Sequence, residues 1–231
     1  MPPKDPSVVL THGAWADGSS WSKVIAALAA RSVRALAAPL PLTSFGDDLA
    51  ALDRTLERVN GPVVLVGHAY AGAVIGATRD ERVRALVYVA ALAPDEGETV
   101  ADVFYRAEPH PQAPKLAPDS HGLIYLPDAS FAQAFAPNAS AEEQTVLAAV
   151  QRPISPACIT VAMQRPLWKD RPTWYLVAEQ DRMVVRETQR FMAERMKARV
   201  RSHSVDHTPL VTAASVVVDI IREALETVGD R

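Results

Sequence analysis

Short apolar runs alternate with longer amphipathic stretches over residues 1–94 of this chain and again over residues 171–231. Runs rich in β-branched and other apolar residues predict strands at 7–11, 33–37, 63–66, 83–90 and 173–178, and a last strand is predicted at 199–205. Helical spacing predicts helices between them, at about 19–28, from near 70, and at 48–59, 186–197 and up to 228. Strands that alternate with helices of this length predict a mostly parallel sheet of about six strands, with helices on both faces.

This alternation stops between residues 95 and 170, where much of the chain's proline lies and short helical pieces alternate with loops. The clearest helix there spans 138–150 and begins at Ser140-Ala-Glu-Glu, a pattern typical of a helix start. Because a long insertion at the carboxyl end of a strand usually serves function, we interpret 95–170 as a helical cap over the site. The predicted architecture is a single α/β domain with its core at 1–94 and 171–231.

The most informative stretch is 61–75, where an apolar strand ends abruptly at Gly67 and a helix begins near Tyr70. A strand, a tight turn and a helix in this order form the nucleophile elbow of the G-x-S-x-G motif. Gly67 and Ala71 take the outer positions, which must be small because a larger side chain would collide with the neighbouring strand and helix. The central position, where the nucleophilic serine is expected, is Ala69. An alanine methyl group cannot attack a carbonyl.

A serine hydrolase also needs a base that takes the proton of the nucleophile and an acid that orients this base. His207 follows the last predicted strand, and Asp181 follows the strand before it. Because the carboxyl ends of parallel strands meet at one edge of a sheet, we expect both side chains to lie near Ala69. Their order along the chain is the nucleophile, acid, base order of this elbow motif. His203 lies inside a strand and Asp206 adjoins the base, so neither is chosen.

Two backbone N–H groups are needed to bind the developing oxyanion, one after the nucleophile and one from the loop after the first strand. These are predicted at Tyr70 and Ala14, the latter after His12-Gly13. His68 is interpreted as a packed residue of the elbow. The residues predicted to line an apolar substrate pocket are Trp15, Phe104, Leu126 and Trp168.

The composition narrows the possible partners. A net charge of −3 gives no basis for binding nucleic acid or an anionic membrane, and no apolar run approaches the length of a membrane span. The single cysteine, Cys158, excludes an internal disulfide. Residues 1–6 lack the apolar region of a signal peptide, which predicts a cytoplasmic protein, although a secreted form without its leader would look the same. A homodimer is possible, because the aromatic residues and prolines of the cap fit a dimer contact as well as a pocket lid.

Four blocks of the sequence resemble the α/β-hydrolase superfamily, and most of all small bacterial esterases akin to plant methylesterases and hydroxynitrile lyases: 12–21, 67–72, 87–95 and 206–210. The resemblance spans the whole chain but is poor inside the cap. It implies an α/β-hydrolase fold and a serine carboxylesterase that uses no metal or organic cofactor and acts on a small-molecule ester through an acyl-enzyme. Some relatives hydrolyse bulky apolar esters, including pyrethroid-type ones.

The resemblance also implies residues that this chain lacks. Relatives carry Gly-His-Ser-Tyr at the elbow, where this chain has Ala69. The lyases carry a threonine in the oxyanion loop and a lysine after the catalytic histidine, at positions that are Gly13 and Thr208 here, which weakens a lyase interpretation. A lactonase would use the same catalytic residues as an esterase, so the sequence does not separate these two activities.

Three explanations of Ala69 compete: a serine replaced by alanine to trap an uncleaved ester, a natural non-catalytic protein that binds a small ligand, and a reaction without a serine nucleophile. We favour the first, because His207, Asp181 and both oxyanion donors are all present. The protein with Ala69 is then expected to be nearly inactive as an esterase.

Overall fold

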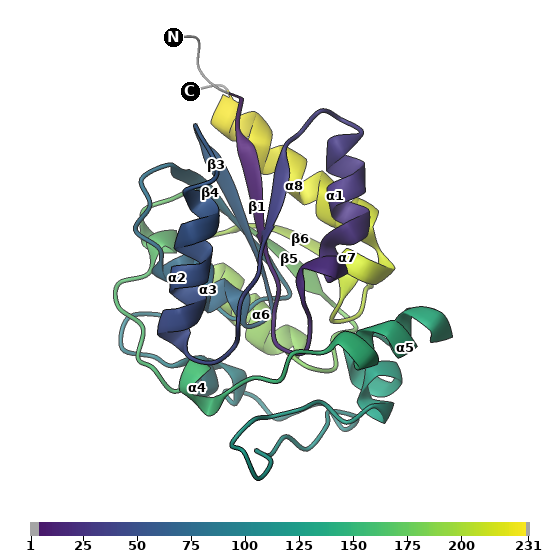
Figure 1. Ribbon diagram of the computed structural model, residues 1–231. Helices are drawn as coiled ribbons and strands as arrows, with labels where there is room; N and C mark the ends of the chain where they lie inside the picture. The colour runs from purple at the N-terminus through teal and green to yellow at the C-terminus, as the bar shows by residue number, and fades with distance from the viewer. Residues whose placement is uncertain (1–4, 230–231) are drawn as a thin grey trace.

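Six parallel strands form one sheet in the order β2-β1-β3-β4-β5-β6. The computed structural model (Figure 1) describes residues 5–229. The signal-peptide prediction rests on residues 1–6, most of which lie outside the described residues. The strands are β1 (Ser7–Thr11), β2 (Ala35–Ala38), β3 (Val63–His68), β4 (Val83–Val89), β5 (Thr173–Ala178) and β6 (Arg199–His203). The prediction of a parallel sheet of about six strands flanked by helices is confirmed.

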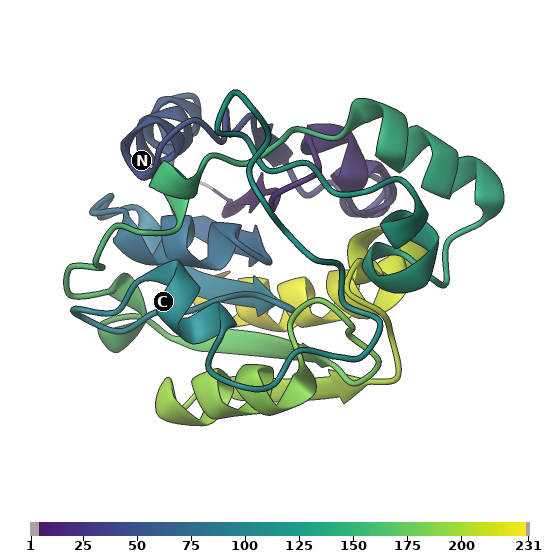
Figure 2. The same cartoon turned by 90° about the horizontal axis from the view of Figure 1, so that it is seen from below.

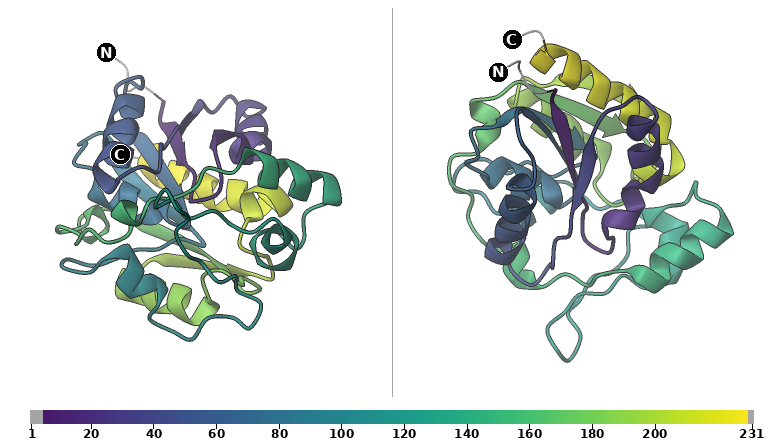
Figure 3. Two further views of the ribbon diagram at one scale, coloured as in Figure 1. Left: turned by 60° about the horizontal axis from the view of Figure 1, so that its bottom comes forward. Right: turned by 45° about the horizontal axis from the view of Figure 1, so that its top comes forward.

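Helices cover both faces of the sheet. On one face lie α1 (Ser22–Ala29) and α8 (Ala214–Gly229), and on the other lie α2 (Phe45–Leu56), α3 (Ala71–Ala77) and α6 (Arg186–Arg195), as Figures 1 and 3 show. A short α7 (Pro209–Thr212) precedes α8. Because both faces are covered, β1, β3 and β5 are buried along their whole length, which explains their unbroken apolar sequences.

Two helix starts differ from the prediction because an earlier residue provides the cap. Helix α2 begins at Phe45, since the side chain of Ser44 accepts a hydrogen bond from the backbone N–H of Asp47. The helix expected from residue 19 begins as a 3-10 turn, η1 (Gly18–Trp21), because Asp17 accepts from the N–H of Ser19. These shifts move boundaries but leave the order of elements as predicted.

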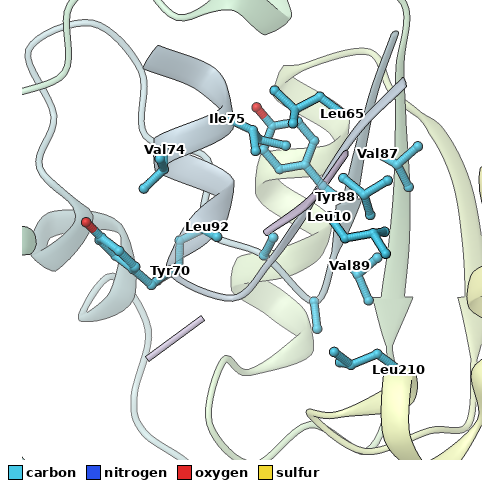
Figure 4. Packing of buried hydrophobic residues seen from close by; sticks show 14 of the residues in the cluster. Leu10, Leu65, Tyr70, Val74, Ile75, Val87, Tyr88, Val89, Leu92 and Leu210 are labelled. Atoms are coloured by element: carbon cyan, nitrogen blue, oxygen red, sulfur yellow. The ribbon is translucent and has the colours of Figure 1, made fainter. Parts of the chain in front are cut away.

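Helix α3 packs on β3 and β4. Figure 4 shows Tyr88 of β4 beside Ile75 of α3, while the ring of Tyr70 points away from the sheet. Glycine is required at this contact, because a Cβ on Gly72 would lie 2.3 Å from the carbonyl oxygen of Leu92. The helix that follows the elbow is therefore held directly against the loop that leaves β4.

Residues 95–170 lie between β4 and β5 and cross the carboxyl ends of the strands (Figures 1 and 2). They contain α4 (Val100–Phe104), η2 (Phe131–Phe135), α5 (Ala141–Val150), η3 (Pro156–Cys158) and η4 (Leu167–Lys169). An isolated antiparallel bridge joins Ile124 to Ile154. Ser140 caps α5 in a reciprocal capping box with Glu143, as its sequence indicates. Among the described residues, no helix has both the length and the apolar character that crossing a membrane requires.

The strand order changes direction between β1 and β3, because β1 pairs with β2 on one side and with β3 on the other. In open parallel sheets, ligands bind beyond the carboxyl ends of the strands at such a switch point. The loops that follow β1 and β3 begin at the same level, since Thr11 pairs with Gly67. The two loops predicted to form the oxyanion site are thus neighbours.

Candidate active site

The turn between β3 and α3 has the strained geometry of a nucleophile elbow. Ala69 adopts a φ of 49°, in the left-handed region that non-glycine residues rarely occupy. The turn is held on both sides, because the carbonyl of Ala69 accepts from Leu92 N–H at 2.9 Å and its N–H donates to Val89 at 3.3 Å. Gly67 fits only without a side chain, since a Cβ there would lie 2.9 Å from the carbonyl oxygen of Ala71. The structure therefore keeps the elbow although its central side chain is a methyl group.

Asp181 and His207 form a buried pair beside this turn. The Nδ1 atom of His207 lies 2.8 Å from Oδ2 of Asp181, and the side chains are 2% and 0% exposed. Since the carboxylate accepts, Nδ1 carries the proton and the lone pair of Nε2 is left for the cavity. The Asp181 carboxylate also accepts from the backbone N–H groups of Met183 and Val184, at 2.7 and 2.9 Å, and from the Gln189 amide at 2.8 Å. These four donors stabilise a buried carboxylate.

The loops after β5 and β6 meet because their pairing continues beyond the strands. Glu179 donates its backbone N–H to His203, and Gln180 donates to Val205. This pairing brings the segment with Asp181 alongside the segment with His207. Asp206 is engaged elsewhere, since its carboxylate accepts from Asn138, Thr208 and Thr212.

The backbone N–H groups predicted to bind the oxyanion belong to two residues at the cavity over Ala69. Ala14 and Tyr70 both line the cavity there, and within residues 5–229 neither N–H donates a hydrogen bond. The loop that carries Ala14 approaches the elbow closely, because a Cβ on Gly13 would lie 2.8 Å from the Cβ of Ala69. The next residue, Trp15, has a φ of 58°. It is bonded to the cap, because its backbone N–H donates to the carbonyl of Arg152 at 3.0 Å and its indole N–H donates to the carbonyl of Ile124 at 2.9 Å.

A cavity lies over Ala69 and His207, and we call it the inner cavity. Trp15 and Phe104 line it, as predicted, whereas Leu126 and Trp168 do not. Leu126 is buried within the cap, where its backbone bonds the side-chain amide of Gln151. Trp168 donates its indole N–H to the carbonyl of Pro94. Tyr105 also lines the cavity, and the apolar lining that the sequence did not indicate comprises Leu92, Val100, Ala101, Leu116, Ile124, Ile154, Ile159, Met183 and Val184.

Two further histidines support these loops. Burial lowers the pKa of His12 to about 4; its Nδ1 bonds the carbonyl of Gly13 and its Nε2 accepts from Leu40 N–H. Burial also lowers the pKa of His68 well below its usual value. His68 donates from Nε2 to the carbonyl of His207 at 2.7 Å, and the two rings lie 4.8 Å apart. Both side chains are neutral at pH 7 and hold backbone groups in place, which agrees with the interpretation of His68 as a packed residue.

A buried carboxylate lies behind the elbow, and the sequence does not predict it. Asp48 is fully buried and accepts from the hydroxyl of Tyr70 and from Leu42 N–H, both at 2.7 Å. Burial raises the pKa of Asp48. In the sequence, Asp48 follows Asp47 at the start of a helix, where acidic residues are usually exposed, so no local pattern marks it.

No group of three or more His, Cys, Asp or Glu side chains within the described residues could hold a metal ion.

Comparison with known proteins finds one matching family and several solved structures with a similar fold. Residues 8–220 match the profile of the alpha/beta hydrolase family. A sequence search of curated proteins finds no significant match. The fold is similar to that of polyneuridine aldehyde esterase, at 17% identity and a TM-score of 0.78, over 95% of this chain and 99% of that chain.

Two other solved structures are similar over nearly their whole length. A pyrethroid hydrolase from Sphingobium faniae JZ-2 gives a TM-score of 0.81 at 19% identity, over 98% of this chain and 100% of that chain. A variant of tomato methylketone synthase I complexed with beta-ketoheptanoate gives 0.82 at 16% identity, over 97% and 99%. At such identities, these likenesses concern the fold.

Proposed function

This chain belongs to the alpha/beta hydrolase family, and we propose that its site is that of a serine carboxylesterase whose nucleophile position holds alanine. The observation that carries the proposal is the left-handed turn at Ala69, φ 49°, held beside His207. Strain of this kind costs on the order of 1–3 kcal/mol and persists where the surrounding structure fixes it, most often at functional sites. An alanine gains nothing from such a turn, whereas a serine there would face the base.

In the proposed reaction each polar group has one role. A serine oxygen at position 69 attacks the ester carbonyl while Nε2 of His207 takes its proton, and Asp181 keeps the imidazole oriented. The N–H groups of Ala14 and Tyr70 hold the negative oxygen of the tetrahedral intermediate. The C–O bond then breaks, and His207 returns the proton to the leaving alcohol. Water then attacks the acyl-enzyme while His207 takes its proton. The bond to the serine oxygen breaks, His207 gives the proton to this oxygen, and the acid leaves.

The lining of the inner cavity supports a neutral, apolar substrate. None of its lining residues carries a charged carboxylate, ammonium or guanidinium group, and aromatic side chains come from Trp15, Phe104 and Tyr105. A charged group would lose its hydration there without gaining a partner. We therefore propose a small apolar or aromatic ester, with a pyrethroid-like ester as one such compound; a lactone would meet the same groups.

We further propose that Ala69 is the replacement of a serine and that the chain as given binds its ester without turning it over. Losing the serine in a comparable triad costs about 10⁶-fold in turnover. The pairing of Asp181 with His207 and the free N–H groups of Ala14 and Tyr70 support this, because a protein without catalysis would gain nothing from keeping them. A natural protein that binds a small ligand is the alternative.

Ala69 itself also favours a second candidate, a reaction that needs no nucleophile. A structurally similar methylketone synthase was solved with beta-ketoheptanoate. When a β-keto acid loses CO₂, its C–C bond breaks and the electron pair moves to the keto oxygen, where the N–H groups of Ala14 and Tyr70 could hold it. The carbon then takes a proton, and no attack on a carbonyl occurs. The absence of a cationic side chain from the lining weakens this candidate, since the substrate carboxylate would have no partner.

The deciding experiment compares the chain as given with Ala69→Ser and with Ala69→Gly, using a short-chain nitrophenyl ester. We expect Ala69→Ser to raise turnover by at least about 10³-fold. Ala69→Gly is the matched control, because it relieves the same turn without adding a hydroxyl group. If Ala69→Ser folds with an unchanged melting temperature and shows no gain, the esterase proposal is wrong. Release of CO₂ from beta-ketoheptanoate by the chain as given would then support the second candidate, and inertness toward both would support a binding protein.

A further inference from the structure

A second cavity adjoins the inner cavity on the side of the cap loop 104–116. We call it the outer cavity. Four residues line both cavities: Phe104, Tyr105, Leu116 and Met183. The space above Ala69 and the outer cavity are therefore neighbours that meet at these four side chains.

The lining of the outer cavity is mostly apolar. Besides the shared residues, it consists of Ala107, Pro109, Ala113, Pro114, Lys115 and Val185. Prolines and alanines lose little conformational entropy when a ligand packs on them, which favours binding of an apolar group. Lys115 is exposed and is the one charged side chain of this lining.

The outer cavity lies on the acid–base side of the site. Met183 lines both cavities and donates its backbone N–H to the Asp181 carboxylate at 2.7 Å. The same carboxylate holds His207 at 2.8 Å. In ester cleavage the histidine gives its proton to the oxygen of the leaving alcohol, so the alcohol part of the ester must lie on this side.

We propose that the outer cavity binds the alcohol group of an elongated, neutral ester whose acyl group fills the inner cavity. The inference rests on the proposed esterase function and names its substrate class: esters of an aryl or long alkyl alcohol. The layer formed by Phe104, Leu116 and Met183 then selects for length, since a short alcohol ends before it and gains nothing from the outer cavity.

The chain as given allows a direct test, because without a nucleophile it holds an ester intact. Dissociation constants are measured by calorimetry for 2-naphthylmethyl butanoate, which has its large group on the alcohol, and for methyl 2-naphthylacetate, which has it on the acyl group. Ala113→Trp fills the outer cavity without touching the inner one, and Leu116→Trp fills the shared layer. Val161→Trp is the matched control, because Val161 is 47% exposed and lines neither cavity.

We expect Ala113→Trp to weaken binding of 2-naphthylmethyl butanoate by about tenfold, or about 1.4 kcal/mol, and to change binding of methyl 2-naphthylacetate by less than about twofold. Leu116→Trp should weaken binding of both esters, because Leu116 lines both cavities. Val161→Trp should change neither. For Ala113→Trp, an equal loss for both esters, no loss for either, or a loss for the acetate alone would overturn the inference while leaving the esterase proposal intact. If no ester binds and Ala69→Ser hydrolyses none, the proposed function fails and this inference fails with it.

Discussion

The acid–base side and the nucleophile side of the site differ in how their polar groups are satisfied. On the acid–base side, the Asp181 carboxylate accepts four hydrogen bonds, one of them from His207. On the nucleophile side, Ala69 offers only a methyl group, and the N–H groups of Ala14 and Tyr70 find no acceptor within residues 5–229. The first side is satisfied within the folded chain, whereas the second has two N–H groups without a protein acceptor, as the proposed binding of an oxyanion would require.

This difference separates stability from activity. A change on the acid–base side leaves buried donors without their acceptor, so it affects folding as well as catalysis. A change on the nucleophile side removes groups that the folded chain does not use, so its effect falls on catalysis. Each side can therefore be tested by asking whether activity and stability change together.

The largest effect is expected from His207→Ala made on the Ala69→Ser background. Without the base, the serine proton has no acceptor, and turnover of a nitrophenyl ester should fall by about 10⁶-fold, back to the level of the chain as given. His203→Ala on the same background is the control, because His203 ends strand β6 and does not line the inner cavity. If activity survived in His207→Ala, the assignment of the base would be wrong.

The next largest effect is expected from Asp181→Asn on the Ala69→Ser background. An asparagine cannot hold the same tautomer of His207, which in comparable triads lowers turnover by about 10⁴-fold. The free energy of unfolding should fall as well, because Met183 and Val184 lose a charged acceptor. Asp206→Asn, which alters a carboxylate beside the base but outside the pair, should leave turnover largely unchanged. Full activity of Asp181→Asn would mean that Asp181 is not the acid that orients His207.

On the acid–base side, the sequence predicted that Asp181 and His207 lie close together, whereas their catalytic roles stay predictions. Asp181 follows the apolar run of β5, His207 follows the mostly polar last strand β6, and parallel strands bring such positions to one edge. The elbow was found in the same way, because Gly67 interrupts a β-branched strand directly before a helix. The α/β architecture and the sheet of six strands followed from the same alternation.

The cap could not be predicted in this detail because its backbone is irregular. Ile124 and Ile154, which an isolated β-bridge joins, both line the inner cavity. Leu126 is only two residues from Ile124 and does not line it. No period of two or 3.6 links these positions, so the sequence does not show which apolar residues face the ligand. For the same reason Trp168 was predicted in a pocket that it does not line. The cap bounds, a homodimer and a cytoplasmic location stay predictions.

A smaller effect is expected from pH, through a histidine that supports the nucleophile side. His12 has a pKa lowered to about 4 in the folded chain, against 6.5 in the unfolded one. As pH falls from 6.5 toward 4, the unfolded chain binds a proton that the folded chain does not, so stability is lost across this window and is fully present above it. Between pH 7 and pH 5 we expect a loss of about 2 kcal/mol.

Urea unfolding at these two pH values measures the loss. His12→Asn should make the dependence on pH less steep, because the amide keeps a donor for the carbonyl of Gly13 but does not titrate, while the buried His68 still contributes. His121→Asn is the control, since His121 is exposed. An equally steep dependence in His12→Asn would mean that other groups, such as the buried His68, account for the loss.

The smallest effect is expected from Trp15→Phe, which tests whether the cap positions the oxyanion donors. Phenylalanine keeps a ring beside Phe135, 6.4 Å away, but loses the indole N–H that bonds the carbonyl of Ile124. The carbonyl of Ile124 keeps the backbone N–H of Ile154 as a donor, at 3.1 Å, so the change removes one hydrogen bond worth about 0.5–1.5 kcal/mol. Because Trp15 directly follows Ala14, we expect this loop to loosen and kcat on the Ala69→Ser background to fall by about tenfold while KM stays nearly constant.

Trp168→Phe is the matched control for this change. It also removes an indole N–H bonded to a cap-side carbonyl, that of Pro94, but Trp168 lies outside the inner cavity. It should therefore leave kcat within about twofold. A trifluoromethyl ketone, whose hydrated or enzyme-bound oxygen resembles the oxyanion, should bind Trp15→Phe more weakly in proportion to the loss in kcat. If Trp15→Phe instead raised KM and left kcat unchanged, Trp15 would be a wall of the substrate pocket, and the nucleophile side would hold its donors without help from the cap.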